Sequence, residues 1–333
     1  MLNQESYQSL HEYLSRHLSA KELEMMISHN PVMFFQPGET ILHQGKYATG
    51  IYLIISGTVL VTAKMLGEGI TQLETLDHGN FIGEASFIEH IPCPTSMTAQ
   101  NEVECLFLTK TYIEFLTAYY PEIKYHLYRA ISAQVCARIK QVHDKIIKFM
   151  SESNMLSRPF FGDIIHSLTK PQEIHQEDIS ISSQEIHDMY LFQGFSSNEV
   201  TELLKHTILL KAGKNCTLIH KGEKNASNYI VIQGAVQTSI VQDNKIAKLS
   251  IIGPATLFTS ISCEDLALSY TITFTTREET ILLKLSDTGL DYIEKNLPTI
   301  WYKLYNLICR SLVALEKSVD KLDIRLNVET YNR

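Results

Sequence analysis

The stretch YLIISGTV at residues 52–59 has a counterpart, YIVIQGAV, at residues 229–236. In both, a run of β-branched and aromatic residues ends at a glycine, as in a buried strand that leads into a tight turn. The two stretches lie 177 residues apart. The same strand and turn therefore occur twice in the sequence.

Three further pairs of segments keep this offset of 177 residues: LSAKELEMMISH (18–29) with FSSNEVTELLKH (195–206), LHQG (42–45) with IHKG (219–222), and YYPEIKYHLYRAI (119–131) with NLPTIWYKLYNLI (296–308). A constant offset across separate segments indicates an internal duplication. We therefore expect two copies of one structural unit.

Each copy follows the same pattern of signals. It opens with a short helix that Ser19 or Ser196 caps, since serine accepts from the free N–H groups of a first turn. Short strand-like runs follow, separated by glycines, and Pro37-Gly38 is typical of a type II turn. Many short strands with regular turns predict an antiparallel sandwich or barrel. A long helix closes each copy.

The fold class that follows is mainly β with flanking helices (α+β). We expect two antiparallel double-stranded β-helix (jelly-roll) domains, each with a short N-terminal and a long C-terminal helix. The predicted boundaries are 1–150 for the first domain, 151–182 for a linker and 183–333 for the second domain.

The closing helices carry apolar residues at alternating spacings of four and three: Val135, Ile139, Val142, Ile146 and Phe149 in one, and Ile308, Leu312, Leu315, Val319, Leu322 and Leu326 in the other. This period of about 3.5 residues predicts a seam between two helices, within one chain or between two chains. The alternative is that each helix lies on its own β-roll. The seams favour self-association or a partner protein that binds through the long helices.

The composition excludes several classes of protein. The chain has 333 residues, 44% of them hydrophobic and 20% charged, which is ordinary for folded domains, and its net charge of −8 argues against a nucleic-acid surface. No apolar run is long enough for a membrane span, and the N-terminus lacks the features of a secretion signal, so we expect a cytoplasmic protein without membrane contact. Six cysteines without a C-x-x-C pair predict reduced thiols and no metal centre.

Enzyme signatures are absent from the sequence: it has no G-x-S-x-G elbow, no G-x-x-x-x-G-K-[ST] loop and no H-E-x-x-H site. We therefore expect a protein that is not an enzyme and that requires no cofactor.

The segments FFQPGETILHQG (34–45), YLIISGTV (52–59) and LDHGNFIGEASF (76–87) together resemble the cyclic-nucleotide-binding domain family. Its members include catabolite-activator-type transcription factors and the regulatory subunits of cAMP-dependent protein kinase. The resemblance implies a sensor or regulatory protein whose ligand is a cyclic nucleotide such as cAMP or cGMP. Ligand binding would then move the closing helix, Pro121 to Met150.

The resemblance also implies a ligand site. Gly83 and Glu84 match the Gly-Glu of the family's phosphate-binding cassette, and Ala85 and Ser86 continue its short helix. A glycine followed by one helical turn presents N–H groups to an anion. Glu84 would accept from a ribose hydroxyl. Thr95 or Ser96 would offer a hydroxyl to the phosphate.

The sequence departs from the family where an arginine usually pairs with the phosphate, because Cys93 stands there. No Lys or Arg occurs between Lys64 and Lys110. The first site is therefore expected to bind a cyclic nucleotide weakly, to bind something less charged, or to bind nothing. In the last case Gly83 and Glu84 only form a turn and cap a helix.

The second copy departs further. Its segment 253–274 has Gly253 but no Glu after it and no Arg, while Glu264 and Asp265 add negative charge. We expect this copy to keep the fold without a nucleotide site.

Three functions stay open at this point. The first is a cytoplasmic sensor with a ligand in the first domain only. The second is a scaffold that keeps the fold and dimerises or holds a partner without a ligand. The third is a DNA-binding regulator of the catabolite-activator type, for which residues 181–204 superficially suggest helix, turn and helix.

Overall fold

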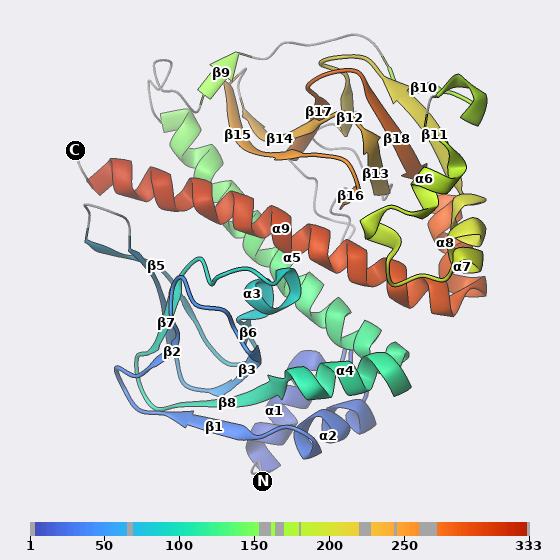
Figure 1. Cartoon of the computed structure of the whole chain (residues 1–333). Coiled ribbons are helices and arrows are strands. Elements are labelled where there is room, and N and C mark those ends of the chain that lie inside the picture. The colour runs from blue at the N-terminus through green and yellow to red at the C-terminus, as the bar shows by residue number, and fades with distance from the viewer. Residues whose placement is uncertain are drawn as a thin grey trace. The chain divides into compact units, whose positions relative to one another are not determined.

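The computed structural model describes residues 4–64, 69–152, 161–163, 170–179, 181–219, 228–242, 245–259 and 272–331. Within these residues the chain folds into two antiparallel β-rolls with flanking helices (Figure 1). The predicted fold class is confirmed.

The first roll has two helices before its strands, a short helix within them and two helices after them. Its elements are α1 (Gln4–Leu14), α2 (Ala20–Ser28), β1 (Val32–Phe35), β2 (Thr40–Leu42), β3 (Gly50–Ser56), β4 (Val59–Lys64), β5 (Ile70–Leu76), β6 (Phe81–Ile82), α3 (Glu84–Glu89), β7 (Ser96–Ala99), β8 (Val103–Thr109), α4 (Lys110–Tyr119) and α5 (Pro121–Glu152).

The strands of the first roll form two four-stranded sheets, in the orders β1-β8-β3-β6 and β2-β7-β4-β5. Alternate residues of β4 are buried, since successive side chains of a strand point to opposite faces. The inward side chains form one apolar core, which includes Ile41, Leu42, Ile54, Val59, Val61, Leu76, Ile82 and Cys93. Strand β6 ends the first sheet, so one of its edges lacks a neighbouring strand.

The second roll repeats this plan. Its elements are β9 (Phe161–Asp163), β10 (Gln172–Glu173), η1 (Gln176–Asp178), α6 (Ser183–His187), η2 (Tyr190–Phe192), α7 (Ser197–Leu204), β11 (Thr207–Ala212), β12 (Thr217–Ile219), β13 (Asn228–Gln233), β14 (Val236–Gln242), β15 (Lys245–Ile252), β16 (Thr256–Thr259), β17 (Ile272–Thr276), β18 (Thr280–Leu285), α8 (Asp287–Asn296) and α9 (Pro298–Tyr331).

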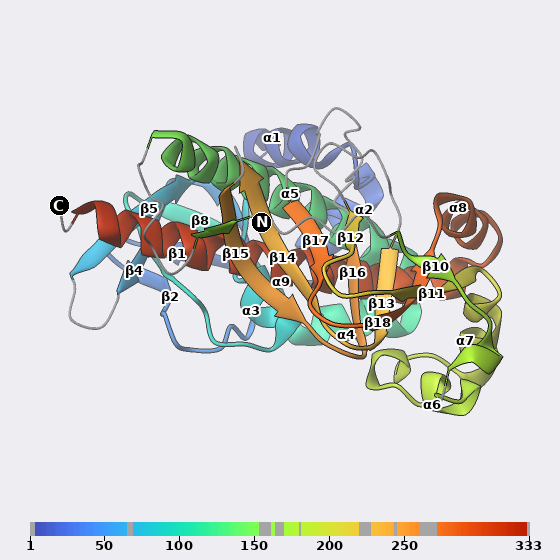
Figure 2. The ribbon, with the colours of Figure 1, turned by 90° about the horizontal axis from the view of Figure 1, so that it is seen from above.

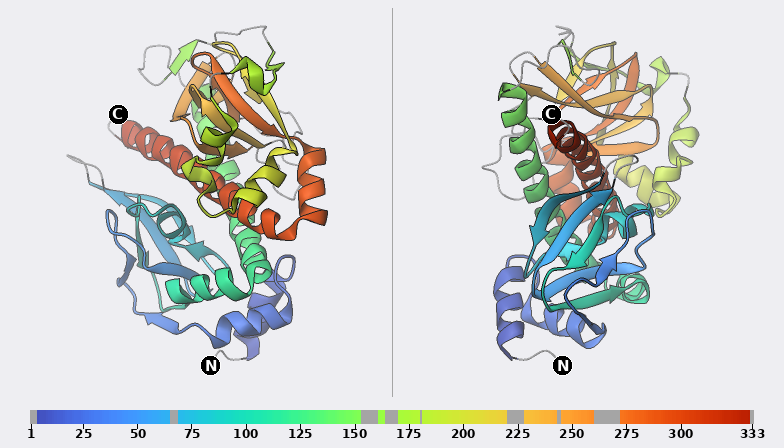
Figure 3. Two further views of the ribbon diagram at one scale, coloured as in Figure 1. Left: turned by 45° about the vertical axis from the view of Figure 1, so that its right-hand side comes forward. Right: turned by 90° about the vertical axis from the view of Figure 1, so that its left-hand side faces the viewer.

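Its two sheets have five strands each, in the orders β10-β11-β18-β13-β16 and β12-β17-β14-β15-β9. Figure 2 shows β14, β15 and β17 side by side in the second of these sheets. In both views of Figure 3, α4 leads directly into α5, and α8 leads directly into α9. Each repeat therefore ends in the same pair of helices.

The predicted local signals have the expected geometry. Ser19 and Ser196 both cap their helices, and Glu22 and Glu199 complete a capping box in each. At Gly38 the φ angle is 88°, and the N–H of Glu39 donates to the carbonyl of Gln36, as a type II turn requires.

The two long helices, α5 and α9, are each divided between the two compact units of the chain. The chain divides into two compact units, residues 1–138 with 313–333 and residues 139–312. The second half of α9 is therefore part of the unit that contains the first roll. The alternative that each long helix lies wholly on its own roll is wrong for residues 313–331. The predicted domain boundaries at residues 150 and 183 follow from the sequence repeat and remain a prediction.

Four cysteines are free and buried: Cys93, Cys105, Cys216 and Cys309. Cys136 is disulfide-bonded, so the prediction of reduced thiols is wrong at this position. Sequence spacing does not reveal such a bond, because it joins residues that only folding brings within reach. Among the described helices, none has both the length and the apolar character that crossing a membrane requires.

Candidate functional site

The predicted cassette begins at Gly83, where β6 ends. Gly83 has a φ of 83° and is the residue from which α3 starts, and its carbonyl accepts from the N–H of Phe87. A Cβ atom at this position would lie 3.0 Å from Cδ1 of Leu42. Both the left-handed φ and the close packing call for glycine. The short helix predicted from the sequence is present.

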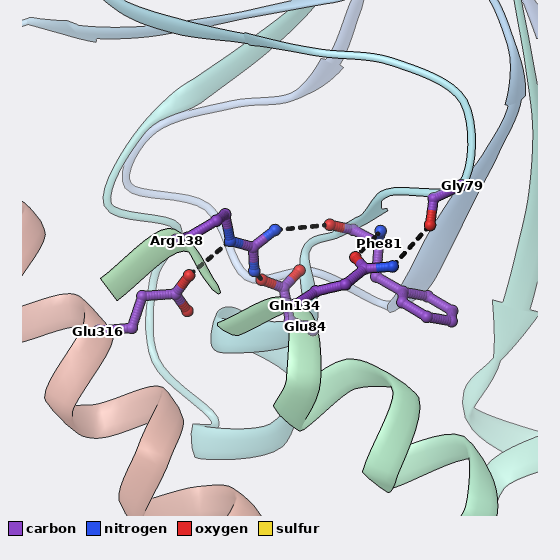
Figure 4. Close-up of polar contacts among 6 residues, drawn as sticks. All are labelled: Gly79, Phe81, Glu84, Gln134, Arg138 and Glu316. Carbon is purple, nitrogen blue, oxygen red and sulfur yellow. Dashed lines mark hydrogen bonds and ion pairs between the residues drawn. The ribbon is translucent and has the colours of Figure 1, made fainter. Parts of the chain in front are cut away.

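Glu84, the first residue of α3, is bound by an arginine that sequence reasoning missed. Nη2 of Arg138, on α5, donates to Oε1 of Glu84, and Nε of Arg138 donates to Oε1 of Glu316 at 2.6 Å. Figure 4 shows Arg138 between these two carboxylates, one on α3 and the other on α9. Both glutamates are buried and Arg138 is mostly buried, with exposed fractions of 6% for each glutamate side chain and 13% for that of Arg138.

The same face of α5 completes the free edge of β6. Nη1 of Arg138 donates to the carbonyl of Phe81 at 3.1 Å, and Nε2 of Gln134 donates to the carbonyl of Gly79 at 2.6 Å. The N–H of Phe81 donates to Oε1 of Gln134 at 2.9 Å (Figure 4). Buried main-chain groups need such partners. Two side chains one helical turn apart therefore do for β6 what a neighbouring strand would do.

The charged groups of this cluster change one another's pKa values. Burial would lower the pKa of Arg138, but Glu316 and Glu84 outweigh that effect and raise the pKa above its usual value. Burial raises the pKa of Glu316 to about 7, although Arg138 opposes the rise. Burial and the neighbouring Glu316 also raise the pKa of Asp320 well above its usual value. The cluster thus contains more carboxyl groups than guanidinium groups.

The predicted hydroxyl groups bind the main chain of one loop. Oγ of Ser86 accepts from the N–H of Ala48 at 2.9 Å and donates to the carbonyl of Ile91 at 2.5 Å. Oγ of Ser96 accepts from the N–H of Gln44 at 3.0 Å. Both serines therefore anchor the segment 44–48, which brings the two parts of the predicted site together.

The remaining predicted residues are placed as follows. Thr95 is 5% exposed, and Ala85 is partly buried. The prediction that Gly83, Glu84, Ala85, Ser86, Thr95 and Ser96 hold a ligand stays a prediction.

Cys93 lies inside this site as a neutral side chain. Its N–H donates to the carbonyl of Lys46 at 2.7 Å, and its carbonyl accepts from the N–H of Gly45. Burial raises the pKa of the Cys93 thiol, and Ser86 and Glu84 both interact with the thiol. A side chain at position 93 is therefore close to the cassette, where the resemblance places the phosphate-binding arginine.

Arg138 and Glu316 could have been suspected from the sequence on one ground only. Each is a charged residue next to the apolar positions of a closing helix, beside Ile139 and Leu315. Such residues are usually solvated, and 178 positions separate the two. The pattern alone does not show that they meet.

Residues 32–120 match the family model described as "Cyclic nucleotide-binding domain". This match confirms the resemblance seen in the sequence. It covers the strands of the first roll and the cassette, and it ends at the start of α5.

Two curated proteins align with the chain. Lysophospholipase NTE1 of Kluyveromyces lactis is 28% identical over 96 residues, which are 28% of this chain and 7% of that protein. The cAMP-activated global transcriptional regulator CRP of Pasteurella multocida is 25% identical over 188 residues, which are 55% of this chain and 85% of that protein. The chain thus spans a small part of the first relative and most of the second.

A solved structure titled "cAMP bound PfPKA-R (141-441)" covers 97% of this chain and 93% of its own, with 14% sequence identity and a TM-score of 0.33.

The second repeat differs from the first at the residue where the predicted cassette would begin. Tyr52 pairs with Ile82 in the first roll, and Tyr229 pairs with Phe258 in the second. The residue after Phe258 is Thr259, which continues strand β16. The counterpart of Gly83 is therefore Thr259 and not Gly253, which corrects the comparison made from the sequence. Glu264 and Asp265 lie outside the described residues.

Metal chemistry has no support in the described parts of the chain, where no group of three or more His, Cys, Asp or Glu side chains is arranged to hold an ion.

Proposed function

We propose that the protein is a non-enzymatic, cytoplasmic regulatory protein whose first roll binds a ribose-bearing ligand of the cyclic-nucleotide type, and whose second roll binds none. Gly83 and Glu84 would form the first part of the ligand-binding segment, and Ala85 and Ser86 would continue it. Thr95 and Ser96 lie on its other side. The family match and the retained Gly-Glu support this proposal.

The observation that carries the proposal is the position of Glu84. Its Oε1 atom accepts from Arg138, which also binds Glu316 on α9. A ligand that engages Glu84 would change the pairing of Arg138 and hence the hold on the second half of α9. Binding would then shift the population of two arrangements of the long helices, because the ligand favours one of them.

Burial of Glu84 adds a condition. Its Oε2 atom is buried, so a ligand reaches it only after the side chains that cover it have moved. We therefore expect ligand binding and movement at Arg138 to occur together.

The test is a calorimetric titration of the full chain with cAMP, cGMP and the parent nucleosides. We expect binding by at least one of them, and its loss in Glu84→Gln. Glu89→Gln is the matched control, because it makes the same change at the other end of α3. Absence of heat with every ligand at millimolar concentration would reject the sensor function.

The second candidate is a scaffold that has lost its ligand. It is favoured by the internal use of Ser86, Ser96 and Glu84, each of which already has a partner in the protein. In that case α5 and α9 would serve self-association or a partner protein. Light scattering that shows a concentration-dependent dimer, together with a silent titration, would select this candidate.

A DNA-binding role ranks third, because the net charge of −8 opposes binding to a polyanion. A gel shift with duplex DNA at low salt tests it.

A further inference from the structure

The place where a ligand would meet the cassette is acidic. Glu84 and Glu316 bind Arg138 directly, Glu74 adds negative charge close to them, and the carboxyl group of Asp320 lies near Glu316. One guanidinium therefore faces four carboxyl groups. Burial is the main cause of the raised pKa values of Glu316 and Asp320, and neighbouring carboxyl groups raise them further.

Among the described residues, the cation recorded at Glu84 is Arg138, which already binds Glu84 and Glu316. Cys93 carries a neutral thiol beside Ser86 and Glu84, and the sequence from 65 to 109 contains no Lys or Arg. The side chain of Lys46 is exposed, although its carbonyl binds the N–H of Cys93. Lys317, on α9, lies in the field of Glu89, at the far end of α3.

A cyclic phosphate would add one more negative charge to this cluster. Burying a charge without a partner is unfavourable, and neighbouring like charges increase the penalty. A ligand without the phosphate avoids both penalties. The charges around Glu84 thus discriminate against the anionic form of a ligand.

The cluster also contains acceptors that lack a donor. Oε2 of Glu84 and Oε2 of Glu316 are buried, and neither has a hydrogen-bond partner among the described residues. A buried acceptor left unpaired loses the hydrogen bonds that it would make in water. A ligand that brings hydroxyl donors to Glu84 restores such bonds.

The number of free hydroxyls differs between the two kinds of ligand. A ribonucleoside has free 2′ and 3′ hydroxyls on adjacent carbons, and a carboxylate can accept from both. A 3′,5′-cyclic nucleotide has its 3′ oxygen in the phosphate ring and offers the 2′ hydroxyl alone. The larger number of hydroxyl donors and the lack of a phosphate charge therefore both favour the ribonucleoside over the cyclic nucleotide.

We propose that the first roll takes a neutral ribonucleoside in preference to a cyclic nucleotide, with Glu84 accepting from the ribose hydroxyls. This proposal rests on the proposed function, which places a ribose at Glu84. It goes further in naming the ligand class.

The experiment is a titration of the full chain with adenosine, guanosine, cAMP and cGMP, each measured separately by calorimetry. We expect one nucleoside to bind at least about tenfold more tightly than its cyclic counterpart. A cyclic nucleotide that binds as tightly as its nucleoside, or more tightly, overturns this inference and leaves the proposed function standing. Silence from all four ligands overturns both.

A variant tests the electrostatic cause. Cys93→Arg places a guanidinium beside Ser86 and Glu84, so the ratio of cyclic nucleotide affinity to nucleoside affinity should rise at least about tenfold. Cys93→Ser is the matched control without charge, and it should keep the wild-type preference. An unchanged ratio in a folded Cys93→Arg protein would contradict the inference. If circular dichroism shows that this variant does not fold, the wild-type ratio decides alone.

Discussion

The two repeats differ at the end of one strand. In the first, Ile82 pairs with Tyr52, and Gly83 then turns with a φ of 83° into α3. In the second, Phe258 occupies the place of Ile82, and the chain continues as β16 through Thr259. A left-handed φ is strained for a β-branched residue such as threonine. The two repeats thus differ at the residue that follows this position, which is glycine before α3 in the first and threonine at the end of β16 in the second.

The turn before this strand is alike in the two repeats. The N–H of Gly79 donates to the carbonyl of Ile54, and the N–H of Ala255 donates to the carbonyl of Val231. Both Gly79 and Ala255 have a positive φ, 82° and 55°. This turn is therefore kept in both copies.

The closing helices differ in the same sense. The repeat offset relates Arg138 to Leu315, so one copy has a guanidinium where the other has a buried apolar side chain. In the first copy this residue ties the cassette to α9. In the second copy, Thr259 and Leu315 stand at the positions of Gly83 and Arg138.

The largest effect is expected when Arg138 is replaced by the residue of the second repeat. Arg138→Leu leaves Glu84 and Glu316 buried without their common partner and should lower the free energy of unfolding by about 3–5 kcal/mol. Urea denaturation measures the change, and hydrogen exchange should locate it in β6 and α3. Lys140→Leu, at an exposed position of the same helix, serves as control. Similar stability losses in both variants would refute the role of the arginine.

The next effect concerns the turn. Gly83→Thr installs the residue of the second repeat at a φ of 83° and should lower the free energy of unfolding by about 1–3 kcal/mol. The added side chain would also meet Leu42. Gly69→Thr is the control, because a Cβ atom there has no neighbour within 4 Å. If Gly83→Thr proves harmless in denaturation, the difference between the repeats has another cause.

A smaller effect depends on pH. The pKa of Glu316 is about 7 in the folded protein, compared with 4.5 ordinarily, so the folded state binds more protons between these values. The free energy of unfolding should therefore fall as the pH rises through this range, by on the order of 1–2 kcal/mol. Glu316→Gln should flatten this part of the profile, and Asp320 should leave a remainder. An equal slope in wild type and variant would contradict the assignment.

The smallest effect tests what the repeats share. Ser19→Ala and Ser196→Ala each remove a capping box, so each should cost about 1 kcal/mol, and the two costs should agree. The capping glutamates also bind the closing helices at related positions, Glu22 to His126 and Glu199 to Lys303. Thermal unfolding followed by hydrogen exchange in α2 and α7 would compare them. A large inequality would show that the two opening helices are not equivalent.

Much of the local structure at and around the candidate site was predictable from the sequence. Gly83 before a short helix, the capping serines and the Pro37-Gly38 turn each depend on residues a few positions apart. The position of Cys93 beside the cassette also followed, because the family pattern places it there. Local steric rules act in the same way wherever the segment lies.

The partners of Glu84 were not predictable. Arg138 meets Glu316 across 178 residues of sequence, and the second half of α9 belongs to the unit of the first roll, not to its own repeat alone. The apolar spacing indicated that each closing helix packs, but not against which surface.

The amino-acid sequence by itself determined the duplication, the glycine-hinged rolls, the cysteine at position 93 and the lack of a Gly-Glu pair in residues 253–274. These follow from short-range sterics and from residue types. Only the tertiary structure decided that Arg138 binds Glu84 and that Glu316 binds the same guanidinium. Such pairing depends on which buried charges packing brings together, and the cost of leaving any of them unpaired arises only once they are away from water.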